Sequence, residues 1–445
     1  MLERCEVDPG LFAGALRIVR ILRQAGHEAF FAGGAVRDFL LGRAVSDIDI
    51  ATSAEPGQIE DLFPATIPVG RQFGVIIVVD GSCQYEVATF RRDLGYVDGR
   101  HPREVTFVGA EEDARRRDFT INALFYDPVT EQVIDYVDGQ SDLENRIIRT
   151  VGDPAERFGE DKLRLMRAVR FACRLGFSIE PATYRELVAR ADEIEKVSSE
   201  RIRDELIKIL TAESSAEGLE LLLECGLLSA FLPEAAAMSG VAQPPAFHPE
   251  GDVFVHTCLM FRLAAQLHPA LALGILLHDV GKPPTFRIAE RIRFDGHAEV
   301  GATMAESICR RLRLSNEITR EVVDLVRDHL RFMHVRDMRE STLKRFLRKE
   351  NFPDHLELHR LDCLASHGDL TNYEFCVRKL EEFGKEVIRP QLLLSGHDLI
   401  AAGLKPGPLF SEILRALEDR QLEGTLHSKE EALVWLRENW LSNGD

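Results

Sequence analysis

Apolar and polar positions in the first 150 residues alternate between helical and strand periodicity. The spacing of apolar residues predicts helices over 11–24 and 36–41. Short runs rich in β-branched and aromatic residues predict strands at 29–32, 48–52, 75–79 and 85–90. Asp80-Gly81 lies between the last two runs and is a signal for a hairpin turn. The pattern predicts a mixed sheet with helices on it, α/β or α+β in type.

Beyond residue 150 the periodicity is helical. Over 153–232 apolar residues recur every three or four positions, as at Leu163, Met166 and Val169. A stretch rich in Pro and Gly at 240–251 predicts a domain boundary. The region from 252 to about 370 is helical again and rich in histidine, and a helical tail with a tight turn follows it.

Composition sets bounds on this organisation. A chain of 445 residues is too long for one ordinary core and favours roughly two to four domains. Its 45% hydrophobic and 29% charged residues are typical of a folded globular protein. No apolar run is long enough to span a membrane, and the first residues lack the blocks of a signal peptide. The eight cysteines are scattered singly, which argues against a disulfide scaffold and favours a reducing cytoplasm.

The formal net charge of −18 excludes general electrostatic attraction to nucleic acid. It leaves room for local basic patches, and two tracts, 91–103 and 160–174, are locally basic. If RNA binds, it binds to such patches, and its affinity should fall steeply with salt.

Gly33-Gly34, Arg37 and the pair Asp47 and Asp49 are the first residues that indicate chemistry. A Gly-Gly turn lets backbone N–H groups approach phosphate oxygens, and an arginine can bind a triphosphate through two hydrogen bonds. The two aspartates would share one face of a strand, where they repel unless cations lie between them. Two Mg²⁺ ions that bridge a nucleoside triphosphate fit this pattern, and Glu86 could supply a third carboxylate. Each motif alone is more often structural, but their joint occurrence predicts nucleotidyl transfer.

Arg117, Asp118 and Asn122 form a second polar group. Asp118 and Asn122 are four residues apart, so on a helix they would share a face and could contact a ribose hydroxyl and a base. The alternative is an ordinary capped helix start, with Asp118 or Thr120 as the cap.

A third group, Asp161, Arg164, Arg167 and Arg170, repeats every three residues. On a helix, Asp161 and Arg164 would be neighbours and would offer an acceptor beside a donor fork. Such a pair can bind the Watson–Crick edge of a base, so protein side chains could replace a nucleic-acid template. The alternative is a salt bridge on a solvated face. Because a separate apolar stripe is available for packing, the arginine stripe is surplus to the fold.

A series of histidines and aspartates forms a separate constellation in the second half of the chain. Its members are His256, His278, Asp279, His297, His329 and Asp362. Imidazoles and carboxylates in this mixture suit one or two transition-metal ions that activate water. A single histidine on such a helix would more often be structural.

The motifs of the first half resemble those of the class II tRNA nucleotidyltransferase/poly(A) polymerase family, whose catalytic domain is similar to DNA polymerase β. The resemblance covers roughly 25–240, and the motifs occur in order at 33–49, 117–122, 138–139, 160–164 and 200–206. It implies template-independent addition of CCA, or part of it, to the tRNA 3′ end from CTP and ATP. Asp47 and Asp49 would hold Mg²⁺, while Asp161 and Arg164 would pair with the incoming base. Arg117, Arg167 and Arg170 would contact phosphates or support the pocket.

The region from His256 to about Asp369 is similar to HD-type metal-dependent phosphohydrolase domains. This similarity implies a metal site with His256, His278, Asp279 and a downstream aspartate, either Asp362 or Asp369. His297 and His329 would be the additional ligands of two-metal versions. The implied accessory activity is that of a phosphatase or phosphodiesterase with Ni²⁺, Mn²⁺ or another transition metal, although HD domains also occur as inactive scaffolds.

The two resemblances imply four parts: a catalytic head at 1–150, a helical neck at 151–240, an HD domain at 252–370 and a tRNA-binding tail at 371–445. The expected partners are the tRNA acceptor end, CTP and ATP, with no membrane and no inferable protein partner.

Several alternatives remain open. The enzyme could add only A, only CC, or poly(A), and the segment 91–102 resembles a flexible loop associated with the terminal A, which disfavours CC-only addition. In a different class, the HD domain would be the active part beside a degenerate RNA-binding head, or the chain would be a non-catalytic RNA chaperone. The intact carboxylates Asp47, Asp49 and Asp161 argue against both.

Overall fold

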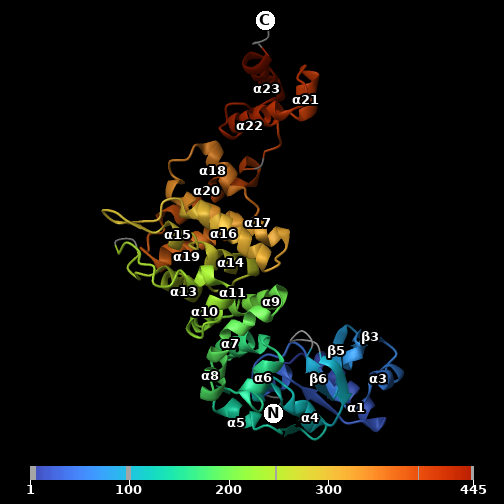
Figure 1. Cartoon of the computed structure of the whole chain (residues 1–445). Helices are drawn as coiled ribbons and strands as arrows, with labels where there is room; N and C mark the ends of the chain where they lie inside the picture. Colours follow the sequence, from blue (N-terminus) through green and yellow to red (C-terminus); the bar gives the residue numbers. More distant parts are fainter. Residues whose placement is uncertain (1–6, 97–101, 246–247, 389, 442–445) are drawn as a thin grey trace. The chain divides into compact units, whose positions relative to one another are not determined.

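The computed structural model describes residues 7–96, 102–245, 248–388 and 390–441 (Figure 1). The chain divides into two compact units, Met1–Ala236 and Ala237–Asp445. Each unit has its own core and is considered separately below.

The first unit begins with a seven-stranded sheet in the order β3-β4-β5-β2-β1-β8-β9. The strands are β1 (Ala29–Ala32), β2 (Asp49–Thr52), β3 (Thr66–Gly70), β4 (Val75–Asp80), β5 (Cys83–Thr89), β8 (Phe125–Asp127) and β9 (Gln132–Ile134). Strand β2 runs parallel to β5, whereas the other neighbours are antiparallel. The sheet is therefore mixed, and the α+β prediction is confirmed.

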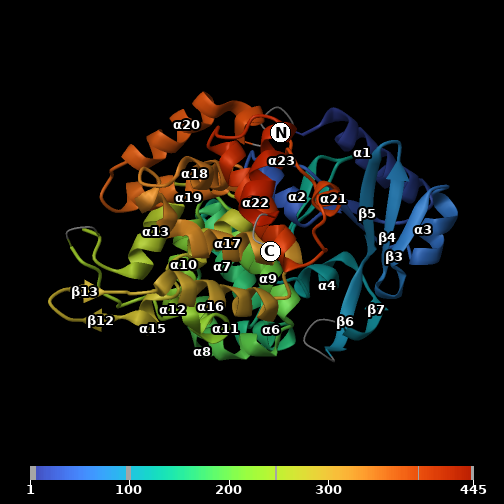
Figure 2. The same cartoon turned by 90° about the horizontal axis from the view of Figure 1, so that it is seen from above.

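Helices of the head pack against this sheet. They are α1 (Pro9–Gln24), α2 (Gly34–Leu40), α3 (Pro56–Leu62), α4 (Ala110–Arg115) and α5 (Gly139–Glu144). Helix α1 contacts β1, β2 and β5, and α3 lies beside β4 (Figure 2). Phe30, Phe90 and Phe125 form the aromatic centre of a buried cluster between the strands and α4. This core fixes the strand ends from which the site residues project.

The segment expected to be a flexible loop is largely a β-hairpin, which corrects that prediction. Strands β6 (Arg91–Tyr96) and β7 (Pro102–Phe107) pair antiparallel, from Arg91 opposite Phe107 to Tyr96 opposite Pro102. The turn itself, 97–101, lies outside the described residues. Alternating apolar positions are scarce in this hairpin, so periodicity alone did not reveal its strands.

The motif at 138–139 makes a tight junction. Asp138 has a φ of 61°, and a Cβ at Gly139 would lie 2.3 Å from the carbonyl oxygen of Thr120. Glycine is therefore required for α5 to approach the 3-10 turn at Thr120–Asn122.

Helices follow to the end of the first unit. They are α6 (Pro154–Glu160), α7 (Leu163–Leu175), α8 (Pro181–Ala189), α9 (Ser199–Leu210), α10 (Ser215–Glu224), α11 (Leu227–Phe231) and α12 (Pro233–Ala236). Leu163, Met166 and Val169 are buried on α7, which packs against α9 and α10. The predicted apolar stripe thus does pack the neck, and the basic stripe of the same helix is left for the site.

The second unit is built around one wholly buried helix, α14 (Pro269–Leu277). Its neighbours are α13 (Val253–Leu263), α17 (Asn316–Asp328) and α19 (Phe352–Ala365). The other elements are α15 (Lys282–Thr285), α16 (His297–Arg311), α18 (Glu340–Leu347), α20 (Thr371–Ile388) and the strands β12 (Arg287–Ile288) and β13 (Ile292–Arg293). A helix that is apolar on all sides is stable only when neighbours surround it, so α14 holds the polar residues at its end rigidly.

The tail has a small core of its own, which includes Leu394, Leu417 and Leu436. Its helices are α21 (Gly396–Ala401), α22 (Pro408–Leu422) and α23 (Lys429–Leu436). Arg345 on α18 donates to Glu418 on α22 at 2.8 Å, which joins the tail to the rest of the unit. Across the described ranges, no helix combines the length and apolar character needed to cross a membrane.

Candidate functional site

One cavity of about 710 Å³ in the first unit gathers the predicted nucleotide-site residues. It is lined by Gly33, Gly34, Arg37, Asp47, Asp49, Glu86, Arg117, Asp118, Asn122, Asp161, Arg164, Arg167 and Arg170. They come from the β1–α2 turn, from β2 and the residues just before it, from β5, from the segment that precedes β8, from the end of α6 and from α7. The fold therefore brings together residues that are up to 137 positions apart in sequence (Gly33 to Arg170).

Three carboxylates crowd one side of this cavity. Asp49 begins β2, and Glu86 lies on the parallel neighbour β5, next to the Ile50–Val87 pair. Asp47 precedes the strand, which corrects the prediction that both aspartates lie on it. Burial, then the charges of Glu86 and Asp47, raise the pKa of Asp49 to about 6 despite nearby Arg117. A buried carboxylate with two further carboxylates beside it is a suitable oxygen donor set for a hard divalent cation.

The Gly-Gly turn has the geometry that its sequence predicted. Gly33 has a φ of 70°, and a Cβ there would lie 3.4 Å from Nη1 of Arg117. Arg37 lines the cavity but is buried, and its Nη1 donates to Oδ1 of Asn122 at 2.6 Å. Its other edge donates to both carboxylate oxygens of Asp38. In this structure Arg37 braces the turn, because its guanidinium donates to protein acceptors.

Asp118 and Asn122 meet as predicted, although a 3-10 turn replaces the expected helix. Nδ2 of Asn122 donates to Oδ1 of Asp118 at 3.2 Å, and Nε of Arg167 donates to Oδ2 at 2.8 Å. Burial alone would raise the pKa of Asp118, but the charges of Arg167 and Arg164 hold it well below its ordinary value. Asp118 is therefore an ionised anchor between the head and α7.

Asp161 and Arg164 do not lie on one helix, which corrects the prediction. Asp161 is the extended residue that ends α6, and α7 begins at Leu163. Both side chains still line the cavity, and each is held by a second residue. Arg201 on α9 donates to the two oxygens of Asp161 at 3.1 and 2.7 Å, and Glu160 accepts from Nη1 of Arg164 at 2.5 Å. The carboxylate of Asp161, an acceptor, and the guanidinium of Arg164, a donor, are thus each held by a different residue and both line the same cavity.

Several cavity residues were missed by the sequence reasoning, namely Arg116, Arg174 and Arg201. Arg201 stands in the segment 200–206, a motif of the resembled family in which no site residue was predicted. Arg170 donates to Glu205 of the same segment at 3.0 Å. Burial, opposed by Glu205 and aided by Arg167, lowers the pKa of Arg170 to about 10, as expected for crowded cations. The neck side of the cavity is therefore strongly basic and suited to phosphate groups.

A second cluster, in the other unit, brings together all the predicted histidines and aspartates. Nε2 of His256 lies 3.1 Å from Oδ1 of Asp362, and Nε2 of His278 lies 3.0 Å from Oδ2 of Asp279. Nε2 of His297 lies 3.5 Å from Oδ1 of Asp279 and 3.2 Å from Nε2 of His329. The cluster contains two donor groups, His256–His278–Asp362 and Asp279–His297–His329. Within each group, the ligand atoms all lie within 4.8 Å of one another.

The donors of this cluster fit metal ions. Nε2 of His256, Nε2 of His278 and Oδ1 of Asp279 are buried and make no hydrogen bond within the described part of the chain. Burial lowers the pKa of His329 to about 4, so its imidazole is neutral and can ligate. Asp369 instead accepts hydrogen bonds from Thr371 at the start of α20. Asp362 is therefore the aspartate that lies at the cluster.

A cavity of about 570 Å³ opens onto this cluster. Besides four of the donors, Lys282, Arg291 and Arg293 line it. Nζ of Lys282 lies 2.7 Å from Oδ2 of Asp279, and the two arginines come from the β12–β13 hairpin. Sequence reasoning had not singled out these cations, which make the cavity suitable for an anionic ligand.

Comparisons with known proteins cover nearly the whole chain. The family model of the poly A polymerase head domain matches 29–149, that of a probable RNA and SrmB-binding site of polymerase A matches 176–238, and that of the HD domain matches 253–358. The CCA-adding enzyme of Streptococcus suis is 34% identical to the chain, over 98% of the chain and 98% of its own length. The CCA-adding enzyme of Anoxybacillus flavithermus is also 34% identical, over 95% of the chain and 96% of its own length.

Solved structures agree with these relatives. The crystal structure of the Bacillus stearothermophilus CCA-adding enzyme in complex with CTP has a TM-score of 0.74 and 30% identity, and the match covers 98% of both chains. A complex of the Thermotoga maritima CCA-adding enzyme with tRNA, at a TM-score of 0.60 and 20% identity, has the same fold.

Proposed function

This chain belongs to the family of bacterial CCA-adding enzymes, and on that premise we propose that it adds C, C and A to the 3′ end of tRNA from CTP and ATP without a nucleic-acid template. The observation that carries the proposal is the single cavity in which three carboxylates face a set of fixed arginines. CC-only, A-only and poly(A) addition have less support, because the full-length relatives are named CCA-adding enzymes.

Asp47, Asp49 and Glu86 are the residues that would hold Mg²⁺ in the head. When bound, Mg²⁺ would lower the pKa of the attacking hydroxyl and neutralise charge on the leaving group. The 3′-hydroxyl oxygen of tRNA forms a bond to the α-phosphorus, the bond from that phosphorus to the bridging oxygen breaks, and pyrophosphate leaves. Arg117 and the arginines of α7 would bind the phosphates, since they line the same cavity.

Asp161 and Arg164 would select the base. Cytosine and adenine both present an amino group beside a ring nitrogen, which match a carboxylate acceptor and a guanidinium donor, whereas uracil and guanine present a carbonyl there. Arg201 and Glu160 would keep this pair in place, because each holds one member through charge-assisted hydrogen bonds. One rigid pair could thus accept both CTP and ATP and reject the other two nucleotides.

The test uses tRNAs that end before CCA, after C and after CC, each with labelled CTP and ATP supplied separately. We expect CTP incorporation into the first two and ATP incorporation into the third. The lack of incorporation into all three would overturn the proposal, and incorporation of ATP alone after CC would identify an A-adding enzyme. An Asp47→Ala variant is the negative control.

The second unit supports a further candidate function, hydrolysis of phosphoesters at the HD cluster. The supporting observation is the convergence of four imidazoles and two carboxylates beside a cation-lined cavity. Ni²⁺, Mn²⁺ or another transition metal is the candidate ion, since both domain types imply metal ions. We expect phosphate release from a phosphomonoester, or opening of a 2′,3′-cyclic end to a phosphomonoester, lost in His278→Ala and retained in Asp47→Ala. No release with any of these metals would leave the domain as a scaffold.

The remaining predictions stay part of the proposal. We place tRNA on the helical neck and on the tail at 371–445, and we keep the four-part division of the chain as a prediction. Cytoplasm is our proposed compartment, supported by buried free thiols such as Cys173, Cys309 and Cys376, which need a reducing environment.

A further inference from the structure

Three of the four histidines in the metal cluster are held in the same way. Nδ1 of His278 lies 2.8 Å from the carbonyl oxygen of Ile275, and Nδ1 of His297 lies 2.8 Å from that of Phe294. Nδ1 of His329 lies 2.6 Å from the carbonyl oxygen of Val326. A carbonyl oxygen can only accept, so Nδ1 carries the proton in each case, and the lone pair lies on Nε2 toward the cluster.

His256 is the exception. The carbonyl oxygen of Val253, three residues earlier, accepts from the hydroxyl of Thr257 at 3.0 Å. Nδ1 of His256 instead lies 2.8 Å from Oε1 of Glu250, while its Nε2 lies 3.1 Å from Asp362 in the cluster. The backbone acceptor of the other three histidines is thus replaced by an ionisable carboxylate.

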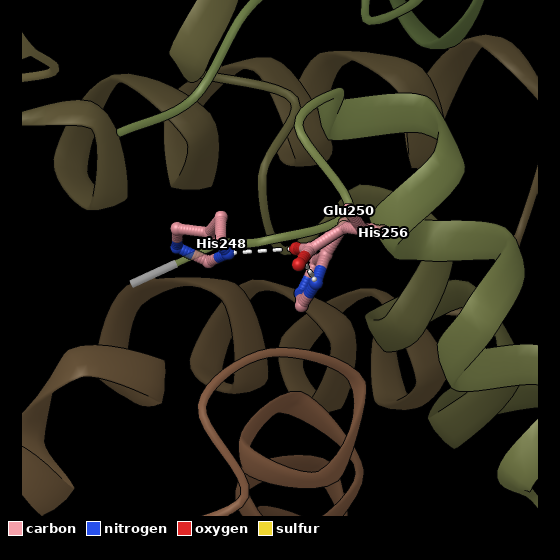
Figure 3. Close-up of side chains that lie close together, drawn as sticks. All are labelled: His248, Glu250 and His256. Atoms are coloured by element: carbon pink, nitrogen blue, oxygen red, sulfur yellow. Dashed lines mark hydrogen bonds and ion pairs between the residues drawn. The ribbon is translucent and has the colours of Figure 1, made fainter. Parts of the chain in front are cut away.

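Glu250 is built into this position by the segment that precedes α13. Its side chain is only 5% exposed, and Oε1 also lies 2.8 Å from Nδ1 of His248. Gly251 has a φ of 81°, and Asp252 caps α13 by accepting from the backbone N–H of Val255. The chain turns back at Gly251, so the side chain of Glu250 lies next to α13. Figure 3 shows its carboxylate between the imidazoles of His248 and His256.

We propose that Glu250 is a positioning residue of the HD metal cluster, which orients His256 and increases the electron donation of its Nε2, and that His248 holds Glu250 in place. This inference rests on the proposed metal-binding role of the cluster. A carboxylate accepts a stronger hydrogen bond than a carbonyl oxygen, so it makes the imidazole a better ligand. The group His256–His278–Asp362 should therefore bind its ion more tightly than carbonyl-held histidines alone would allow.

A different role for the same residues is that of ligands to a separate ion. The ligand atoms of His248, Glu250 and His256 also lie within 4.8 Å of one another. Against this, both 2.8 Å contacts converge on Oε1 of Glu250, the arrangement of two N–H donors that share one acceptor. The two roles predict different metal stoichiometries, so a titration separates them.

The experiment is a titration of the full chain with Co²⁺ alone, followed by equilibrium dialysis and by the visible absorption of the bound ion. All proteins carry Asp47→Ala, Asp49→Ala and Glu86→Gln, which removes the three head carboxylates as ligands. Glu250→Gln keeps the size of the side chain and removes its charge. Glu317→Gln, which removes an exposed charge on α17 outside the lining of the HD cavity, is the matched control.

We expect Glu250→Gln to weaken binding of one Co²⁺ by about 10- to 100-fold with unchanged stoichiometry and a shifted absorption band, as for other acceptors behind a ligating histidine. Glu250→Asp should restore part of the affinity, His248→Ala should cause a smaller loss, and Glu317→Gln should match the parent. Melting curves without metal show whether each variant folds.

Two results would overturn the proposal. One is parental affinity and spectrum in Glu250→Gln. The other is the loss of a whole Co²⁺ equivalent while the remaining ions bind as before, which would make Glu250 a ligand of its own site. Cobalt binding without phosphate release would remove the proposed hydrolysis and leave this inference standing, whereas unchanged cobalt binding in His278→Ala would overturn both.

Discussion

The nucleotide cavity and the HD cluster both collect charged side chains, but they treat those charges differently. In the cavity, the arginines are held by protein acceptors: Arg164 by Glu160, Arg167 by Asp118 and Arg201 by Asp161. In the cluster, Nε2 of His256, Nε2 of His278 and Oδ1 of Asp279 are buried and have no hydrogen bond among the described residues. The first site is organised by the protein itself, and in our proposal the second is completed by an added cation.

The cavity has one part that resembles the cluster, its group of three carboxylates. Asp49 has its pKa raised to about 6 by burial and by Glu86 and Asp47, so this corner also requires a cation. Because Asp47 and Glu86 are exposed, the corner can receive a hydrated Mg²⁺ together with the nucleotide. The comparison therefore predicts two different effects of metal. In the head, metal should be needed for catalysis but not for the folded state, and in the second unit it should stabilise the folded state.

The largest effect should follow from Asp49→Asn, which removes one charge from the carboxylate corner. We expect nucleotide incorporation to fall on the order of 10³-fold or more, since a metal contributes several kcal/mol to the transition state and each 1.36 kcal/mol is tenfold in rate. The melting temperature of the first unit should not fall. Labelled CTP incorporation and calorimetry measure both, and a loss under tenfold would show that the corner is not the metal site.

Removal of metal from the second unit should have the opposite effect, because it should lower the melting temperature of that unit. An ion at one hundred times its dissociation constant stabilises the folded state by about 2.7 kcal/mol, which corresponds to roughly 5–10 °C for a unit of this size. Calorimetry with Mn²⁺ or a chelator should move the transition of the second unit only, and His278→Ala should abolish the shift. If metal shifted the melting transition of the first unit alone, then the head, and not the HD cluster, would be the part that metal stabilises.

The pairing of Asp118 tests whether the cavity is organised by internal charges. Arg167 and Arg164 outweigh burial and lower the pKa of Asp118 below its ordinary value of 3.8, so the folded state binds fewer protons there than the unfolded state. Its contribution is therefore complete above pH 3.8 and is lost as the pH falls through the lower, folded-state pKa. A hydrogen bond to a charged group contributes about 1.5–3 kcal/mol.

In Asp118→Asn, the free energy of unfolding of the first unit should be lower by that amount at pH 7, and the gap to the parent should narrow in acid. Urea melts at pH 7, 5 and 3 measure this gap. A gap that stays constant with pH would show that the pair contributes through packing and not through charge.

The sequence predicted most of the charged residues of the cavity because most of its motifs stand on elements with a clear local signal. The strands at 29–32 and 85–90 and the turn at Gly33-Gly34 are examples. Strands β8 and β9 have three residues each, too few for a periodic signal, and Pro68 and Gly70 interrupt the pattern of β3. Local spacing also misplaced Asp161. Helix α6 ends at Glu160 and α7 begins at Leu163, so Asp161 lies between the two helices and not on the helix of Arg164.

Partners from distant segments could not be predicted from spacing. Arg201 is 40 residues from Asp161, and their contact depends on how α9 packs against α7. Glu250 lies in a Pro/Gly-rich stretch that was interpreted as a boundary only, and its contact with His256 depends on the reversal at Gly251. In both cases the missing residue holds a predicted one, so tertiary packing supplies the positioning and local sequence supplies the chemistry.

The smallest effect should come from Arg201→Lys, which keeps the charge beside Asp161 and removes the planar fork. A lysine binds as a point charge and cannot hold both carboxylate oxygens at once. We expect discrimination between CTP and UTP to fall roughly tenfold, about 1.4 kcal/mol, as Asp161 becomes free to turn. Arg185→Lys, at an exposed position of α8, is the matched control. If kcat/KM falls equally for CTP and UTP, Arg201 acts through phosphate binding, and if neither changes, Asp161 is held by its hydrogen bond from the backbone of Leu163 alone.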